Sequence, residues 1–424
     1  MTEMPSIAVK ISQGSLGAVQ NNSSNYKKAS RNKRMPMYNT FISLWLTAAF
    51  ILIFFAHPLP SYCQSYVVTG EIEVDETYDD NVDYDDITDL ITSIRPSLGI
   101  QGGTQKTSWN LQGLLEHRAH YQEDDKDRTN RSASFFINHA FSPRWNASLN
   151  TSLALDHTLD QSIEEFAIVV TPTKRLSTTI APSTTYYIDS TNVIEVSGQF
   201  TKQHAESESV ADQTNKSASV TWSRQLDEVS SIITTGSYSN IVSELPNRTT
   251  DQNVRRISIG YERQWTEDLS STFSIGPSFS TTTNDFDPGP ELEEDQRSLY
   301  VDGSINWERE KSTYSLSINR QQTQSTLGDP TTRTGIRISA RYLLTERLTS
   351  SFSMSYTYSE RGQDDANESE HYSISPRLRY TLAENLYLGL NYTHSIRRDI
   401  TDDTSEDRNR ISLSLRKTFS ELFD

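Results

Sequence analysis

The chain has 424 residues, of which 34% are hydrophobic, and its formal net charge is −17. The acidic balance argues against a nucleic-acid partner, because phosphate binding requires a basic surface. The low hydrophobic share argues against one large soluble sheet protein, whose core would need more apolar residues.

The N-terminal residues resemble an export signal. Residues 41–56 contain no charge and follow the basic cluster Arg31–Arg34, as the h-region of a secretory signal follows its n-region. We therefore expect a disordered basic extension and n-region at 1–40, the h-region and cleavage region at 41–63, and the mature domain at 64–424. Cleavage is expected near Cys63, or at Ser65, which leaves no disulfide framework. A retained membrane helix is the alternative, although the apolar run is shorter than the ~20 residues it needs.

From residue 69 onward the chain repeats one unit: an alternating strand, a short charged turn, a second strand and a longer polar loop. In Tyr372–His394 the apolar residues Ile374 and Leu378 alternate with Ser375 and Arg377. Successive side chains of a strand lie on opposite faces, so each strand has one apolar and one polar face. Many such strands require one large apolar environment, which a lipid bilayer supplies to a closed barrel.

The pattern predicts an all-β fold: a transmembrane antiparallel up-and-down β-barrel of about 18 strands, with 16 as the alternative. Residues 157–174 are ambiguous, because Phe166–Val170 is either a strand of its own or the extended start of the next one. The expected strands are Val67–Asp75, Asp89–Gln101, Thr107–Tyr121, Arg131–Phe141, Trp145–Asp156, Arg175–Ile188, Asn192–Gln203, Lys216–Gln225, Val229–Asn240, Val254–Trp265, Leu269–Thr281, Arg297–Trp307, Thr313–Thr323, Arg333–Leu344, Leu348–Ser359, His371–Leu382, Leu386–Arg397 and Arg410–Phe419.

The connections between these strands are predicted to alternate strictly between short turns and long loops. Short turns at the periplasmic end and long loops at the outer end are typical of outer-membrane barrels. The short set includes Ser142–Arg144, Thr266–Asp268 and Ala383–Asn385, and the long set includes His204–Asn215, Thr282–Gln296, Glu360–Glu370 and Ile400–Asn409. Six aromatic residues near the short turns suggest a girdle at the head-group level, with cross-strand aromatic pairing as the alternative. They are Trp145, Trp265, Trp307, Tyr342, Tyr380 and Tyr387.

If the apolar face contacts lipid, the opposite face lines the lumen and carries many arginines. The candidate lumen-facing arginines are Arg337, Arg341, Arg377, Arg379, Arg397 and Arg416. The acids expected on the same face are Glu71, Glu73, Glu116, Glu262, Asp302 and Glu308. These charges either pair with one another in a solvated lumen, or the arginines form a path that attracts an anionic polymer.

The sequence offers no enzyme motif, and we expect neither a catalytic residue, a metal nor a cofactor. The acidic segments Asp79–Asp86, Asp364–Asp365 and Asp402–Asp403 are expected to be solvated, mutually repelling loop tips.

Glu71, Glu73, Tyr78–Val82 and Ile94–Leu98 are similar to residues in outer-membrane β-barrel proteins that accompany exopolysaccharide and exosortase (PEP-CTERM) gene clusters. The turns at Thr345–Leu348 and Ala383–Leu386 also resemble that family, and the similarity covers about residues 66–419.

Barrel and resemblance together predict a monomer in the outer membrane of a Gram-negative bacterium, acting as a conduit or accessory protein in export of a surface polysaccharide. A structural or adhesive barrel with functional acidic loops and a lipid-modifying barrel enzyme are the alternatives. The expected partners are outer-membrane lipids and lipopolysaccharide, an anionic polysaccharide, and the barrel-assembly machinery during insertion, but no nucleic acid.

Overall fold

The computed structural model describes residues 66–423 apart from 85, 158–172, 326–327 and 362–366. The predicted segments 1–40 and 41–63, with Cys63, lie outside the described residues, as do Phe166–Val170 and Asp364–Asp365.

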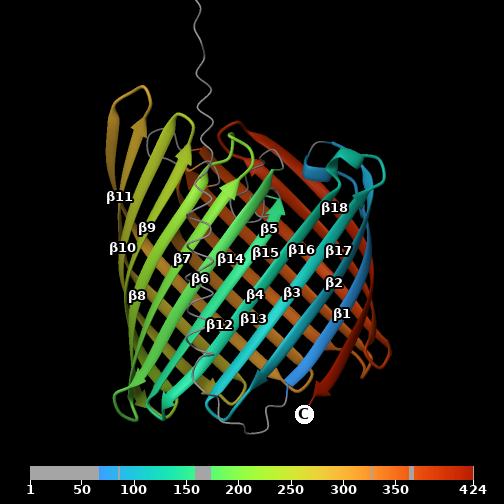
Figure 1. The fold of residues 1–424 in the computed structure, drawn as a ribbon, viewed down its shortest axis with the longest axis horizontal. Helices are drawn as coiled ribbons and strands as arrows, with labels where there is room; N and C mark the ends of the chain where they lie inside the picture. The colour runs from blue at the N-terminus through green and yellow to red at the C-terminus, as the bar shows by residue number, and fades with distance from the viewer. Residues whose placement is uncertain (1–65, 85, 158–172, 326–327, 362–366, 424) are drawn as a thin grey trace, which may run out of the picture. The chain divides into compact units, whose positions relative to one another are not determined.

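The described residues form one sheet of 18 antiparallel strands (Figure 1). The strands are β1 Tyr66–Asp79, β2 Asp89–Gly103, β3 Thr107–His120, β4 Arg128–Ser142, β5 Trp145–His157, β6 Lys174–Tyr187, β7 Asn192–Ala205, β8 Asp212–Asp227, β9 Ser230–Leu245, β10 Arg248–Thr266, β11 Leu269–Phe286, β12 Glu291–Arg309, β13 Ser312–Gln324, β14 Pro330–Leu343, β15 Leu348–Arg361, β16 Asn367–Ala383, β17 Leu386–Asp399 and β18 Thr404–Phe423.

Each strand pairs with its neighbours in sequence, and β1 pairs with β18 along its whole length, from Tyr66 opposite Phe423 to Asp79 opposite Arg410. This pairing closes the sheet and leaves no open edge, as a membrane-spanning sheet requires. The predicted barrel of 18 strands is confirmed, and the alternative of 16 is wrong.

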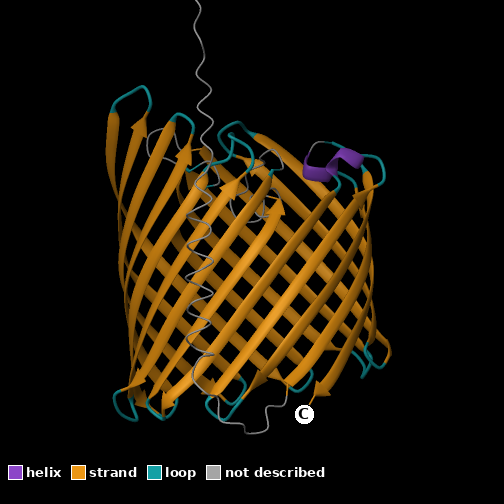
Figure 2. Cartoon of the chain, in the orientation of Figure 1, coloured by secondary structure: helices purple, strands orange, loops and turns teal. Residues whose placement is uncertain are grey.

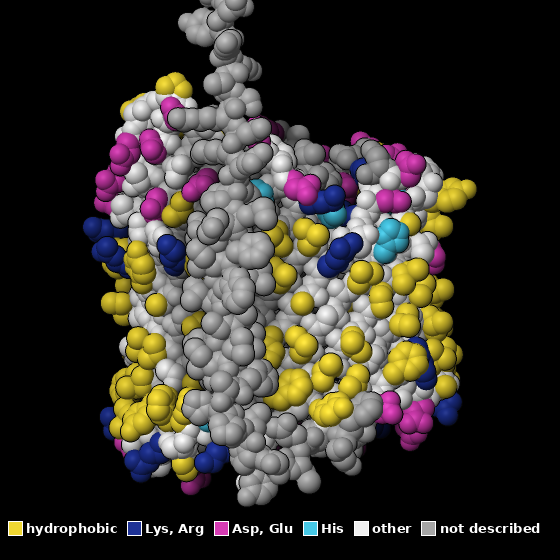
Figure 3. Space-filling view, in the orientation of Figure 1, with side chains coloured by type: hydrophobic (Ala, Val, Ile, Leu, Met, Phe, Trp, Pro, Cys, Tyr) yellow, Lys and Arg dark blue, Asp and Glu magenta, His cyan; other side chains and the backbone are white. Residues whose placement is uncertain are grey.

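The exterior of the barrel is apolar and its interior is polar. Ile257 and Ile259 are 64% and 58% exposed on the outer face, whereas the inward-facing Ser258 between them is buried. Figure 3 shows the apolar side chains as a band between two charged ends. A continuous exposed apolar band of this extent belongs in lipid, so the sheet spans a membrane. Among the described residues, no helix is both long and apolar enough to cross a membrane.

The strands extend further at the loop end than the sequence predicts. The segment Thr282–Gln296 was expected to be a long loop, yet β11 continues to Phe286 and β12 begins at Glu291. The expectation was wrong because the alternation of apolar and polar residues stops where the strands leave the apolar band, while the backbone ladder continues.

Strict alternation of connection lengths is also wrong. Pro246-Asn247 joins β9 to β10 as tightly as Glu267-Asp268 joins β10 to β11 at the other end. The end that holds Pro246-Asn247 is called the loop end below, and the other the turn end. Two short 3-10 turns, η1 (Val82–Tyr84) and η2 (Asp124–Lys126), lie at the loop end (Figure 2).

Five of the six predicted girdle aromatics are on outward-facing positions near the turn end. Tyr387 is the exception, because it lines a cavity inside the barrel. Tyr387 was included in the girdle because it is close to a turn. It lies directly opposite Thr381 on β16, whose side chain faces inward, so Tyr387 faces inward as well.

Candidate conduit in the barrel lumen

Inward-facing arginines follow one side of the lumen, on β14 to β18. We call this set the basic wall, and it consists of Arg333, Arg337, Arg341, Arg377, Arg379, Arg397, Arg408, Arg410 and Arg416. On β14 the arginines recur at every fourth residue, and the strand rises ~3.3 Å per residue. The guanidinium groups are therefore distributed from the loop end to the turn end.

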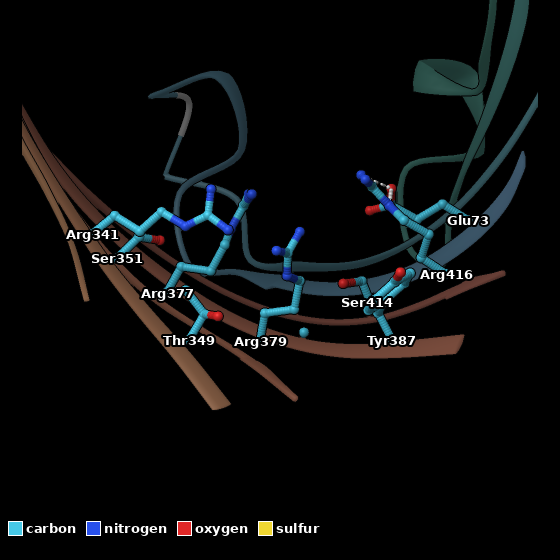
Figure 4. Close-up of a pocket in the computed structure, with 10 residues that line it drawn as sticks. Glu73, Arg341, Thr349, Ser351, Arg377, Arg379, Tyr387, Ser414 and Arg416 are labelled. Carbon is cyan, nitrogen blue, oxygen red and sulfur yellow. Dashed lines mark hydrogen bonds and ion pairs between the residues drawn. The ribbon is translucent and has the colours of Figure 1, made fainter. Parts of the chain in front are cut away.

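The cavity nearer the turn end contains Arg341, Arg377 and Arg379 (Figure 4). Figure 4 shows their guanidinium groups extending into the lumen on the same side of the ribbon. Among the described residues, no carboxylate pairs with any of these three. Arg379 lies over the ring of Tyr387, 5.5 Å from its centroid. This part of the lumen therefore has exposed positive charge.

Arg416 lines the same cavity but is paired. Its Nη2 donates to Glu73 Oε2 at 2.6 Å, and its Nε lies 3.5 Å from Glu71 Oε1. Glu73 also accepts from Arg95 at 2.9 Å. At this point the carboxylates of β1 pair with the basic wall, and the positive charge of Arg416 is largely neutralised.

A second cavity lies nearer the loop end, and its lining contains no carboxylate. Arg333, Arg337 and Arg410 surround it together with hydroxyl groups of β15 and β16. The hydroxyl residues are Ser353, Ser355, Thr357, Ser373 and Ser375. Such a lining offers many hydrogen-bond partners and a positive charge, which suits an anionic, hydroxylated solute.

The loop between β1 and β2 covers this cavity. Its Tyr84 is buried and shares a hydrogen bond of 2.9 Å with Ser395. Burial raises the pKa of the Tyr84 hydroxyl, so the group stays neutral at physiological pH. Asp79, at the end of β1, is fully buried against Arg408, whose Nε donates to both carboxylate oxygens at 3.0 Å.

The prediction that Asp79–Asp86 is a solvated loop tip is therefore wrong. Asp79 and Asp83 are buried, because Arg408 neutralises the first and Lys126 lies 3.5 Å from the second. Composition alone cannot show that an acidic loop has cationic partners elsewhere in the chain.

The β13–β14 hairpin bends inward over the lumen faces of the neighbouring strands β8 to β12. Its pairing with β12 ends at Arg320, and beyond this point Gln324 accepts a hydrogen bond of 2.6 Å from Ser243 of β9. Gln213 of β8 donates to the Ser325 carbonyl at 2.6 Å. Asp329 pairs with Arg248 of β10 at 2.7 Å. The hairpin thus narrows the lumen at the loop end.

The lumen face of β7 to β12 is neutral to acidic, and we call it the facing wall. Its inward carboxylates include Glu195, Glu262, Asp302 and Glu308, and the remainder is mostly Ser, Thr, Asn and Gln. Arg256 also points inward, and its guanidinium stacks 4.0 Å from the ring centroid of Tyr300. The lumen therefore has two sides of different charge.

The structure brings five of the six predicted arginines to the two cavities: Arg337, Arg341, Arg377, Arg379 and Arg416. Arg397 lines neither and pairs with Glu406 at 3.0 Å. Arg333 and Arg408 were not proposed, although their spacing from Arg337 and Arg410 gives them the same parity. Among the described residues, no group of three or more His, Cys, Asp or Glu side chains could hold a metal ion.

No protein-family model and no curated protein matches this chain. Similar solved structures include OpdK of Pseudomonas aeruginosa, crystallised with vanillate, at 10% identity and a TM-score of 0.44, covering 84% of this chain and 99% of that one. OccAB3 of Acinetobacter baumannii is 12% identical with a TM-score of 0.44 and the same coverage. The siderophore receptor PirA of P. aeruginosa is 10% identical with a TM-score of 0.45, covering 83% of this chain and 80% of that one.

At these scores the similarity gives no functional argument, so the class follows from the geometry of the chain. An even number of strands, a closed sheet, an apolar outer band with aromatic residues and a polar lumen define an outer-membrane β-barrel. The protein is a porin-like barrel of the outer membrane.

Proposed function

We propose that the barrel is a passive conduit for anionic solutes. The observation that supports this most directly is the set of inward guanidinium groups on Arg337, Arg341 and Arg377, which have no carboxylate partner among the described residues. They lie opposite a wall whose carboxylates face the same lumen. Inside a barrel, fixed charge of one sign concentrates counter-ions and excludes co-ions.

The distribution of the arginines favours an extended anionic substrate. The basic wall continues from the loop end to the turn end. A polymer with repeated carboxylates would therefore contact guanidinium groups along the whole length of the lumen. Arginine binds carboxylates in a bidentate manner and is always charged. Export of an acidic surface polysaccharide is the role that we assign to the conduit, and the family resemblance of Tyr78–Val82 and Ile94–Leu98 supports the same assignment. This role includes no catalytic step.

Current block by oligosaccharides would test this proposal. The purified chain in a planar bilayer should show current interruptions with an oligomer of a uronic acid, but not with a neutral oligomer of equal length. The variant Arg337→Ala/Arg377→Ala/Arg379→Ala should lose the interruptions. The outward-facing variant Arg255→Ala/Arg263→Ala/Arg297→Ala, with the same change in charge, should keep them. Equal block by both oligomers would contradict the proposal.

A second candidate is a structural barrel with a closed lumen. The Tyr84 loop and the β13–β14 hairpin both occupy the lumen at the loop end, and this observation favours it. A folded, inserted protein without measurable conductance would support this candidate over the conduit.

A further inference from the structure

The sheet separates between β12 and β13 at the loop end. The pairing of β1 with β18 leaves no gap between the first and last strands, but β12 pairs with β13 only from Val301 to Arg309. On its other side, β12 pairs with β11 as far as Glu291. No described strand pairs with Glu291–Tyr300 on the side that β13 leaves. We call this stretch of β12 the open edge.

The edge is open because β13 bends into the lumen. Arg320 is the last residue of β13 that lies opposite β12. Two residues further on, the Gln322 side chain donates to Ser280 at 3.1 Å and to Gln296 at 2.9 Å, and it accepts from Ser278 at 2.9 Å. These hydrogen bonds hold β13 on the lumen side of β11 and β12, so it cannot pair with the open edge.

The backbone groups of the open edge point to the side that lacks a strand. The Glu308 N–H donates to the Asp268 carbonyl at 2.8 Å, on the β11 side. In an antiparallel pair, the N–H and C=O of one residue point to one side and those of the next residue to the other. Even-numbered residues of β12 therefore bond toward β11, and odd-numbered residues direct their backbone groups to the open side. The latter include Glu291, Glu293, Arg297 and Leu299.

The outer part of the open edge is accessible from solution. The β11–β12 hairpin extends beyond its neighbours at the loop end (Figure 1). Glu291, Glu293 and Asp295 face outward and are exposed, and Leu292 between them is 55% exposed. Because a charged side chain is costly against hydrocarbon, this stretch lies beyond the apolar band. An unpaired row of backbone groups in such a place is a template for a further strand.

A second copy of the chain does not fit the open edge. In every copy in one membrane, β12 runs from the loop end to the turn end. A two-fold axis along the membrane normal would bring two open edges together, but strands tilted by ~40° would then cross at roughly 80°. Neighbouring strands of a sheet are rotated by only about 20–25°, so no ladder could form. The geometry therefore favours a different polypeptide as the partner.

The charge of the open edge indicates the composition of that partner. The three outward acids Glu291, Glu293 and Asp295 alternate along the edge, followed by Arg297 and Leu299 on the same face. Residues directly opposite one another on paired strands interact, and opposite charges stabilise the pair. A strand with basic residues at alternate positions therefore complements the outer part of the edge.

We propose that the open edge binds an extended basic segment of another polypeptide, which adds a strand antiparallel to β12 in the place that β13 leaves. Hydrogen bonds to the odd-numbered residues supply the pairing, and alternate lysines or arginines opposite the acids supply selectivity. This inference is independent of the proposed conduit, because it uses the edge of the sheet and not the lumen.

Binding of a synthetic peptide to the full chain in detergent micelles would test the proposal. The probe is as long as the open edge and alternates threonine with valine, glutamate and three lysines, in that order. N-methylation of its three lysines removes the N–H groups that face β12, whereas N-methylation of the threonines before them removes groups that face away. Fluorescence anisotropy should show that the first change weakens binding by about tenfold or more, and that the second leaves it nearly unchanged. Amide exchange in residues 291–299 should slow when the unmodified peptide binds.

A matched pair of variants tests the contribution of charge. Glu291→Gln/Glu293→Gln should weaken binding several-fold, whereas Glu206→Gln/Glu208→Gln, with the same charge change at exposed residues between β7 and β8, should not. Equal binding of the two methylated peptides would overturn the proposal, because charge alone would then attract the probe. Failure of the unmodified peptide to bind at millimolar concentration would also overturn it. So would a dimer of the chain that Glu291→Gln/Glu293→Gln dissociates, since the edge would then belong to a second copy.

Discussion

The two sides of the barrel distribute their charges in opposite ways. On β14 to β18 most arginines face the lumen, and Arg398 is the outward exception. On β7 to β12 the lumen is neutral to acidic, and the exposed cations, such as Arg255 and Arg297, face outward. Because alternate residues of a strand face different media, one step in register decides whether an arginine meets a solute or a lipid. The net charge of a barrel therefore does not indicate what its charged residues do. The role of each charged side chain depends on whether it faces the lumen or the lipid.

The loop end shows a related contrast between buried and exposed ion pairs. The first prediction concerns the buried ion pair between Asp79 and Arg408 of the basic wall. Asp79→Ala should leave Arg408 buried without a counter-charge and lower the free energy of unfolding by about 3–5 kcal/mol. Urea unfolding of the inserted barrel, followed by tryptophan fluorescence, measures this loss. Asp403→Ala removes the partner of Arg398 in an exposed pair and should cost about 1 kcal/mol or less. Equal losses would show that the Tyr84 loop is not held by its buried pair.

The second prediction concerns the hairpin that crosses from the basic wall to the facing wall. Gly328 has a φ of +80°, and a Cβ there would lie 2.8 Å from the Ser243 Cβ. Gly328→Ala should therefore cost about 1–2 kcal/mol and displace the hairpin, which raises single-channel conductance. Gly236→Ala is the matched control, because a Cβ at Gly236 meets nothing within 4 Å. Unchanged conductance in the Gly328 variant would mean that the hairpin does not limit the current.

The third prediction concerns the Tyr84 loop alone. Tyr84→Phe removes the hydrogen bond to Ser395 but keeps the buried ring, so the free energy of unfolding should fall by about 0.5–1.5 kcal/mol. The same urea titration measures it. A loss as large as that of Asp79→Ala would show that the hydroxyl, and not the ion pair, fixes the loop.

The alternation of apolar and polar residues was enough to predict the closed barrel and the face of each arginine, because one period governs the whole chain. It could not place the strand ends at Glu291 or Arg248, since both faces are polar beyond the membrane. It also could not find the buried Asp79–Arg408 pair or the contact between Gln324 and Ser243. These contacts join residues far apart in the chain, and only the register of the closed sheet brings them together.

The charge difference between the two walls is tested most directly by the reversal potential of the purified barrel in a planar bilayer under a tenfold KCl gradient. The wild type should have the reversal potential of an anion-preferring channel. Arg337→Gln/Arg341→Gln/Arg377→Gln should move it toward zero, and Glu262→Gln/Asp302→Asn/Glu308→Gln on the facing wall should move it further toward anion preference. A wild type that prefers cations, or variants that both leave the potential unchanged, would contradict a conduit governed by the basic wall.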